Sequence, residues 1–154
     1  MLSQSTKNFK VPKSLSEIKA KQLIDFSLDR GVNFFDTADI YGEGLVEKIL
    51  GNQIKNHRNK IFVMTKGGIV NNKNDNNFSI KYIKNKLFQS LENLNSDYLD
   101  GYQLHNLNSR FNISSLFEYL KEQKQKGIIK SIGFSSRDPL DAFKIVNKYK
   151  FDFL

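Results

Sequence analysis

The chain has 154 residues, enough for one domain with its own hydrophobic core but short of the roughly 250 residues of a complete (β/α)8 barrel. Its 24 lysines and arginines against 16 aspartates and glutamates give a net charge of +8, and it has no cysteine, which excludes disulfides, a thiol nucleophile and a cysteine-ligated metal. No apolar run approaches the roughly 18 residues of a membrane span, so we expect no membrane partner, and the absence of cysteine fits a cytoplasmic location.

The positive charge does not favour nucleic acid as a partner. Only four of the 24 basic residues are arginine, the residue that base and bidentate phosphate recognition prefers, and the lysines are spread along the chain. We interpret the charge as a solvated, lysine-rich surface, and a milder role in attracting an anionic cofactor or substrate stays open.

Short apolar runs alternate with amphipathic stretches, which is the pattern of βα units around a parallel sheet. Ser14 with Glu17 forms a capping box, and Gly31 supplies the stop of the first helix. In chain order we expect a helix at 14–30, a strand at 32–36, a helix at 45–56, a strand at 61–66, a polar loop at 67–77, a helix at 79–94, a strand at 98–105, a helix at 113–126, a strand at 128–134, a helix at 138–148 and an incomplete strand at 151–154.

These elements predict an α/β fold with parallel strands and roughly five βα units. No linker rich in proline, glycine or serine interrupts them. We therefore expect a poorly defined N-terminal segment at 1–13 and a single domain at 14–154.

Four polar side chains stand at or just beyond the carboxyl ends of the predicted strands: Asp36, Lys66, His105 and Ser135. The carboxyl ends of parallel βα strands lie on one face, which is where ligands bind. We therefore expect the four side chains to converge, with Tyr41 folding over them from a glycine-bearing loop. Four of these five residues also have a plain structural alternative: a turn cap for Asp36, loop packing for Tyr41, a solvent-facing Lys66 and a hydrogen-bonded core position for His105.

Together these groups suit proton transfer to a carbonyl oxygen. A phenol is a weak acid with a reference pKa of about 10, which a neighbouring ammonium lowers while a carboxylate holds the ammonium in place. An imidazole can donate a hydrogen bond to the same oxygen. The sequence shows no nucleophile-base arrangement and no metal-ligand spacing, so we expect no metal.

The sequence resembles a known family, the aldo/keto reductases, in register from about Ser14 to Leu154. The resembling segments are Asp36-Thr37-Ala38-Asp39-Ile40-Tyr41-Gly42-Glu43-Gly44, then Glu47 and Leu50-Gly51, Thr65-Lys66, Gln103-Leu104-His105, Gly127-Ile128-Ile129-Lys130-Ser131-Ile132-Gly133 and Phe134-Ser135.

The resemblance implies an NADPH-dependent oxidoreductase that reduces an aldehyde or ketone to an alcohol on a (β/α)8 barrel. Its catalytic tetrad would fall on Asp36, Tyr41, Lys66 and His105. Tyr41 would be the general acid, Lys66 would lower its pKa, Asp36 would hold Lys66, and His105 would orient the substrate carbonyl.

The cofactor contacts implied by the resemblance are Asp36, Ser135 and Ser136. Ser135 would hydrogen-bond the nicotinamide carboxamide, and Ser136 stands where the family commonly has asparagine. The family's first barrel strand has no counterpart before Ser14, and its last units, which supply most of the phosphate and adenosine contacts, are absent. We therefore expect residues 14–154 to form a partial barrel that binds NADPH weakly when alone.

A second hypothesis is a non-catalytic interaction module, in which the open edges of a partial barrel associate with a second copy or with a partner. Nucleic-acid binding through the lysines is the weakest of the three readings.

Overall fold

The computed structural model describes residues 13–70 and 75–154, with side chains from residue 17 onward. The chain divides into two compact units, residues 1–32 and 33–154. The first unit holds helix α1 (Lys13–Asp29), which ends before Gly31, as expected. The predicted N-cap position of Ser14 is wrong, because the helix begins one residue earlier, at Lys13. The division of the chain at residues 13 and 14 into a terminal segment and one domain stays a prediction.

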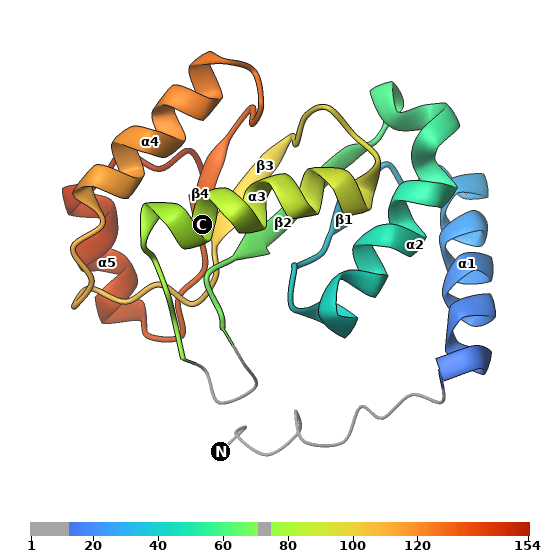
Figure 1. Ribbon diagram of the computed structural model, residues 1–154, viewed down its shortest axis with the longest axis horizontal. Coiled ribbons are helices and arrows are strands. Elements are labelled where there is room, and N and C mark those ends of the chain that lie inside the picture. The colour runs from blue at the N-terminus through green and yellow to red at the C-terminus, as the bar shows by residue number, and fades with distance from the viewer. Residues whose placement is uncertain (1–12, 71–74) are drawn as a thin grey trace. The chain divides into compact units, whose positions relative to one another are not determined.

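The second unit is built on a four-stranded parallel sheet in the order β1-β2-β3-β4 (Figure 1). The strands are β1 (Phe34–Asp36), β2 (Phe62–Gly67), β3 (Gly101–Leu104) and β4 (Ile132–Phe134). Every strand pairs in parallel with its neighbour in sequence, and this confirms the predicted α/β class with parallel strands.

Helices cover one face of this sheet. They are α2 (Leu45–Ile54), α3 (Ile80–Leu94), α4 (Ser114–Gln125) and α5 (Pro139–Lys148), with two 3-10 turns, η1 (Tyr41–Gly44) and η2 (Lys55–Lys60). In Figure 1 α3 crosses in front of the sheet; it packs against β2, α4 packs against β4, and α2 packs against α3. Apolar side chains buried between the sheet and these helices form the core, among them Val63, Ile83, Leu87, Leu104, Leu120 and Phe134.

The opposite face of the sheet is partly open. Phe34 and Phe62 stand opposite each other in the register of β1 and β2, and their rings stack with centroids 5.0 Å apart. They are 50% and 39% exposed. Side chains alternate along a strand, so Asp36 and Lys66 lie on this same face.

Two of the predicted helix caps are confirmed. The Ser79 hydroxyl accepts a hydrogen bond from the Tyr82 amide at 3.3 Å, at the start of α3. The Asp138 carboxylate accepts from the Leu140 amide at 2.8 Å, with Pro139 in the first turn of α5. Each cap satisfies an amide that has no partner within its helix.

The predicted incomplete strand at 151–154 is reduced to one parallel bridge between Phe153 and Gly133, beside which the Asp152 amide donates to the Ile132 carbonyl at 2.8 Å. The Asp152 carboxylate accepts a hydrogen bond from the Ile132 amide, so a side chain takes the place of the next backbone pairing. The Phe153 ring lies directly on Gly133, where a Cβ atom would come within 2.3 Å of it.

The predicted loop at 67–77 is partly ordered into an antiparallel pair. Ile69 bridges Asn76, and the Val70 amide donates to the Asp75 carbonyl at 2.7 Å. The central part of the predicted loop, 71–74, lies outside the described residues.

A charged cluster links η2 to the amino-terminal ends of β2 and β3. The Arg58 guanidinium lies over the Tyr98 ring and contacts the buried Asp100 carboxylate at 2.8 Å, while Lys130 contacts the other oxygen of Asp100 at 2.9 Å. Burial alone would raise the pKa of Asp100, but the hydrogen bonds from Lys130, the Val63 amide and Arg58 hold that pKa below its usual value.

None of the helices in the described part of the chain is long and apolar enough to cross a membrane.

Candidate active site

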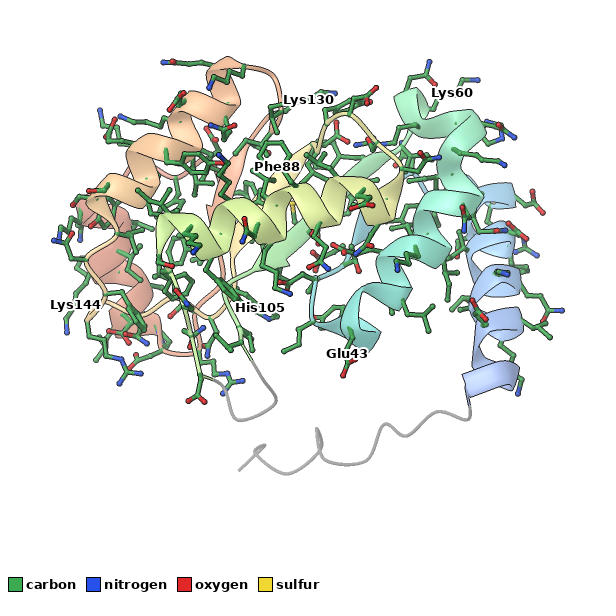
Figure 2. The ribbon with its side chains drawn as sticks, in the orientation of Figure 1. Glu43, Lys60, Phe88, His105, Lys130 and Lys144 are labelled. Carbon is green, nitrogen blue, oxygen red and sulfur yellow. The ribbon has the colours of Figure 1, made fainter. Side chains whose placement is uncertain are left out.

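The carboxyl edge of the sheet brings together the four residues predicted as a tetrad. Figure 2 shows Glu43 and His105 toward this edge and Lys60 and Lys130 toward the opposite one. The Lys66 ammonium is hydrogen-bonded to Asp36 and lies 5.8 Å from the centroid of the Tyr41 ring. The Tyr41 and His105 rings meet edge to face, with centroids 6.2 Å apart.

Lys66 is the buried member of this group. Its side chain is 7% exposed, its ammonium contacts the Asp36 carboxylate, and it donates a further hydrogen bond to the Thr37 carbonyl at 2.9 Å. A buried ammonium is stable only when it is paired and hydrogen-bonded, and both conditions hold here. The predicted alternative of a solvent-facing Lys66 is wrong. Asp36 is half exposed and can still reach a ligand.

Tyr41 opens the 3-10 turn η1, and the residue is 42% exposed. Burial of the hydroxyl and the nearby Asp36 carboxylate both raise the pKa of Tyr41, because both disfavour the phenolate. The expected lowering of this pKa by Lys66 is therefore wrong for this arrangement, in which Asp36 and the Thr37 carbonyl take up the ammonium.

His105 follows β3, and its backbone is fixed on both sides. Its amide donates to the Gly67 carbonyl at 2.9 Å, and its carbonyl accepts from the Asn76 side chain at 3.0 Å. Its buried Nδ1 has no hydrogen-bond partner among the described residues. Burial, with the positive charges of Lys66 and Arg137, lowers the pKa of His105 to about 4, so the ring is neutral at pH 7.

Ser135 and Ser136 follow β4 at the same edge, and both are half-buried. The Ser135 hydroxyl accepts a hydrogen bond from the Asn106 amide at 3.0 Å, which leaves its own proton available to a ligand. The Ser136 hydroxyl instead donates to the Asp138 carbonyl at 3.2 Å. Of the two serines, Ser135 is the one whose hydroxyl is free to donate.

The backbone of the loop at 37–44 is held against β2. The Thr37 amide donates to the Met64 carbonyl at 2.9 Å, and the Asp39 amide donates to the Lys66 carbonyl at 3.0 Å. The loop then turns sharply through Gly44, at φ 89°. Any other residue at Gly44 would strain this conformation, and its Cβ atom, within 2.6 Å of the Asn93 side-chain nitrogen, would displace that side chain.

Sequence reasoning missed a buried polar layer under this loop. Asp39 and Glu47 are both buried, and Lys86 of α3 lies 3.8 Å from the Asp39 carboxylate. The signal for Asp39 was a carboxylate set between the apolar residues Ala38 and Ile40. For Lys86 it was a lysine directly before the buried helix position Leu87.

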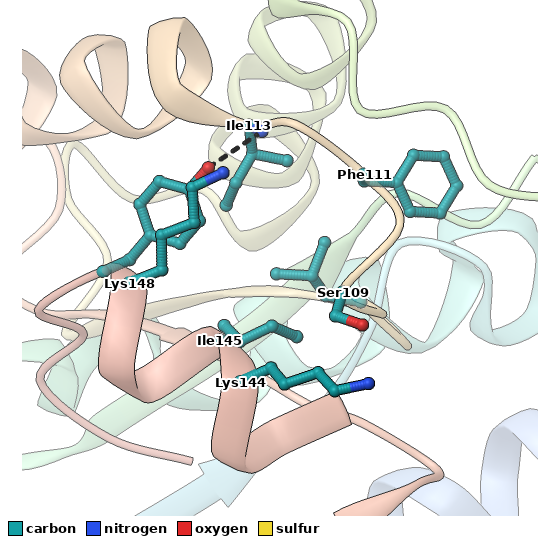
Figure 3. Close-up of a pocket in the computed structure, with 8 residues that line it drawn as sticks. Ser109, Phe111, Ile113, Lys144, Ile145 and Lys148 are labelled. Atoms are coloured by element: carbon teal, nitrogen blue, oxygen red, sulfur yellow. Dashed lines mark hydrogen bonds between the residues drawn. The ribbon is translucent and has the colours of Figure 1, made fainter. Parts of the chain in front are cut away.

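A cavity of about 170 Å³ lies between the 107–113 segment and α5, apart from these residues (Figure 3). Buried Ile113 and Ile145 line it, and Lys144 and Lys148 also contribute to its walls. None of the predicted site residues lines this cavity, so it is not part of the candidate active site. Within residues 13–70 and 75–154 there is no group of three or more His, Cys, Asp or Glu side chains placed to hold a metal.

Comparison with known proteins gives a consistent family. Residues 5–154 match the profile of the Aldo/keto reductase family. The uncharacterized oxidoreductase YqkF of Bacillus subtilis (strain 168) is 39% identical over 127 residues, which cover 79% of this chain and 41% of YqkF. The aldo-keto reductase yakc of Schizosaccharomyces pombe, whose name includes NADP(+), is 31% identical over 126 residues, covering 78% of this chain and 37% of yakc.

Solved structures agree. The holo form of the aldo-keto reductase AKR11C1 from Bacillus halodurans aligns with a TM-score of 0.81 at 34% identity, over 88% of this chain and 47% of that one. The chain thus spans less than half the length of these relatives. The alignment identifies the four-stranded sheet as part of a (β/α)8 barrel, which confirms the predicted partial barrel.

Proposed function

The chain belongs to the aldo/keto reductase family, and from this premise we propose that it carries the acid–base centre for NADPH-dependent reduction of an aldehyde or ketone to an alcohol. The observation that carries the proposal is the buried Lys66 ammonium, paired with Asp36 and set beside the rings of Tyr41 and His105. A structural role alone would not require a buried lysine to meet a phenol and a neutral imidazole at a ligand-binding edge.

Tyr41 is the proposed general acid. Its raised pKa keeps the phenol protonated at neutral pH, and a protonated phenol is the form that can give a proton to a developing alkoxide. In the reverse reaction the phenolate would accept that proton.

Lys66 and His105 are proposed to stabilise and orient the reacting oxygen. The Lys66 ammonium, fixed by Asp36, places positive charge near the oxygen as it becomes negative. The neutral His105 ring can donate one hydrogen bond to the substrate oxygen, and its orientation is set by the backbone contacts on either side.

The residues at the edge fit a nicotinamide ring beside this centre. The Ser135 hydroxyl retains a free proton for an amide oxygen, and the half-exposed Asp36 lies on the same face of the sheet. NADPH bound there would supply the hydride for the carbonyl carbon. Ser136 remains a proposed contact to the cofactor, and its hydroxyl must first break its hydrogen bond to the Asp138 carbonyl. The cytoplasmic location expected from the cysteine-free sequence stays a prediction.

The test is Tyr41→Phe, assayed by single-turnover oxidation of NADPH with an aromatic aldehyde. We expect the rate to fall by about two orders of magnitude or more, the usual worth of a general acid, while NADPH affinity is unchanged. Tyr119→Phe is the matched control, because it also removes a hydroxyl with no hydrogen-bond partner in the described structure, but on α4. An equal rate in Tyr41→Phe and the unmodified chain would reject Tyr41 as the acid.

The interaction module remains the alternative, and the exposed, stacked Phe34–Phe62 pair favours it. Sedimentation over a range of concentrations separates the two proposals. The alternative requires association together with no reduction that depends on Tyr41, whereas a monomer that carries out Tyr41-dependent reduction rejects it.

A further inference from the structure

Two buried carboxylates and one ammonium lie beneath the loop that carries Tyr41. Glu47 is 0% exposed, and its two oxygens accept hydrogen bonds from the Thr65 hydroxyl at 2.6 Å and the Asn93 amide at 3.0 Å. Asp39 is 5% exposed, and neither of its carboxylate oxygens has a hydrogen-bond partner among the described residues. The charge that faces Asp39 is the Lys86 ammonium, 3.8 Å from Oδ2.

This placement makes the ionised Asp39 costly for stability. A buried carboxylate without hydrogen bonds loses its hydration and recovers only part of that loss from an ammonium beyond hydrogen-bond distance. Burial raises the pKa of Asp39 to about 6 and Glu47 adds to the rise, while Lys86 and the Ile40 amide lower this pKa. Tyr82 of α3 and Tyr102 of β3 are the other titratable groups that feel this charge.

The backbone of the same residue lies between Lys66 and the proposed acid. The Asp39 amide donates to the Lys66 carbonyl at 3.0 Å, and the Tyr41 amide donates to the Ala38 carbonyl at 3.0 Å. Lys66 and Tyr41 are therefore both hydrogen-bonded to the short backbone segment at 38–39.

Apolar packing does not fill the space around this segment. A cavity of about 240 Å³ separates the loop from the segment after β2, and Ile40, Glu43, Ile69 and Lys86 are among the residues that line it. Among the described residues, the Asp39–Lys86 pair is the ionic contact between the loop and α3, and both side chains line this cavity.

We propose that Asp39 is a positioning residue for Tyr41: its buried carboxylate, paired with Lys86, fastens the loop at 37–44 to helix α3. The proposal rests on the proposed function only in treating Tyr41 as the acid. Proteins retain destabilising contacts mainly where function requires them, and a buried charge that orders an active-site loop fits this pattern.

The experiment compares Asp39→Asn, Lys86→Met, the double variant and Lys84→Met in the full chain by hydrogen–deuterium exchange at pH 8. Lys84 is the control, because it is an exposed lysine two residues before Lys86 on the same helix. We expect the amides of the 37–44 loop to exchange about tenfold faster in both single variants and in the control no faster than in the unmodified chain. The double variant should exchange no faster than either single variant, because both remove the same contact.

Thermal unfolding distinguishes positioning from plain structural support. Asp39→Asn should leave the midpoint at pH 8 unchanged or raise it, since it removes a buried charge, although the loop exchanges faster. In the unmodified chain, loop exchange corrected for its intrinsic rate should speed up below about pH 6, and Asp39→Asn should abolish this dependence.

Activity gives a third readout. Where the unmodified chain shows Tyr41-dependent reduction, Asp39→Asn should lower the turnover number by about tenfold or more with little change in KM, as misplacement of an acid does. If the chain shows no such reduction, the proposed function fails while loop exchange still decides this proposal. Loop exchange that is the same in all variants, or equally fast in Lys84→Met, would overturn it.

Discussion

At the scale of single residues, the candidate site depends on how each charge is compensated. Lys66 is buried with a carboxylate and a carbonyl around its ammonium, so its charge is satisfied. The His105 ring is buried near the cations Lys66 and Arg137, so it stays neutral at pH 7. The Asp39 carboxylate is buried and faces the Lys86 ammonium at 3.8 Å, which is beyond hydrogen-bond distance. Three titratable groups in one edge of a sheet thus show three different responses to burial.

The state of His105 can be measured directly. We expect its ring to titrate at about pH 4, because burial and neighbouring cations disfavour the imidazolium. The unfolded chain, with an ordinary pKa of about 6.5, binds more protons between pH 6.5 and 4, so the contribution of His105 to stability falls as the pH is lowered through that range. Proton NMR of the imidazole signals reports the pKa, and His57→Gln assigns the second histidine of the chain. A His105 signal that titrates near pH 6.5 would contradict the burial argument.

Single residues were predicted well where side-chain type and position in a strand were both visible. Asp36, Lys66 and His105 each follow an apolar strand, and strand ends of parallel units converge, so their grouping followed from the pattern. The direction of the Tyr41 pKa did not, because it depends on whether the Lys66 ammonium faces the hydroxyl or is already taken by Asp36. These two positions of the ammonium differ by only a few ångströms, and the spacing of residues along the chain does not distinguish them.

At the scale of elements, helix ends were more predictable than strand ends. Helix caps are local, and Ser79 and Asp138 act within three residues of themselves. Strand length depends on the neighbouring strand, and the predicted strand at 98–105 is reduced to β3 with an isolated bridge at Leu99. The predicted strand at 151–154 is reduced to a single bridge, and the Asp152 carboxylate accepts from the Ile132 amide that a longer strand would pair.

The cap of α3 gives a prediction for this scale. Ser79→Ala should lower the free energy of unfolding by about 1 kcal/mol, because the Tyr82 amide loses its acceptor at the helix start. Urea denaturation measures the change, with Lys84→Ala as a control on the exposed face of the same helix. Equal stability of the Ser79 and Lys84 variants would show that water replaces the cap at no cost.

At the scale of the whole molecule, the acid–base residues and the cofactor contacts are unevenly represented. The proposed tetrad is complete in residues 36–105, whereas the predicted nicotinamide contacts are Asp36, Ser135 and Ser136 alone. The chain also spans 47% of the length of its holo structural relative AKR11C1. The sequence could reveal that the tetrad is complete while few cofactor contacts are present, because each motif is recognisable separately along the chain.

We therefore expect the 154-residue chain to bind NADPH only weakly, with a dissociation constant above the micromolar range. Titration followed by NADPH fluorescence measures it, and Ser135→Ala should weaken what binding there is, since its hydroxyl proton is free to donate. The matched control is Ser136→Ala, whose hydroxyl already donates to the Asp138 carbonyl. Micromolar affinity in the unmodified chain would refute the expectation.

The strand order β1-β2-β3-β4 also bears on how the chain is made. Each strand pairs with the one synthesised just before it, so a nascent chain leaving the ribosome can add every new βα unit to an edge that already exists. Lys66 can meet Asp36 as soon as β2 has emerged, and His105 joins them one unit later. The acid–base centre can therefore assemble during translation, before Ser135 and the rest of the cofactor edge have emerged from the ribosome.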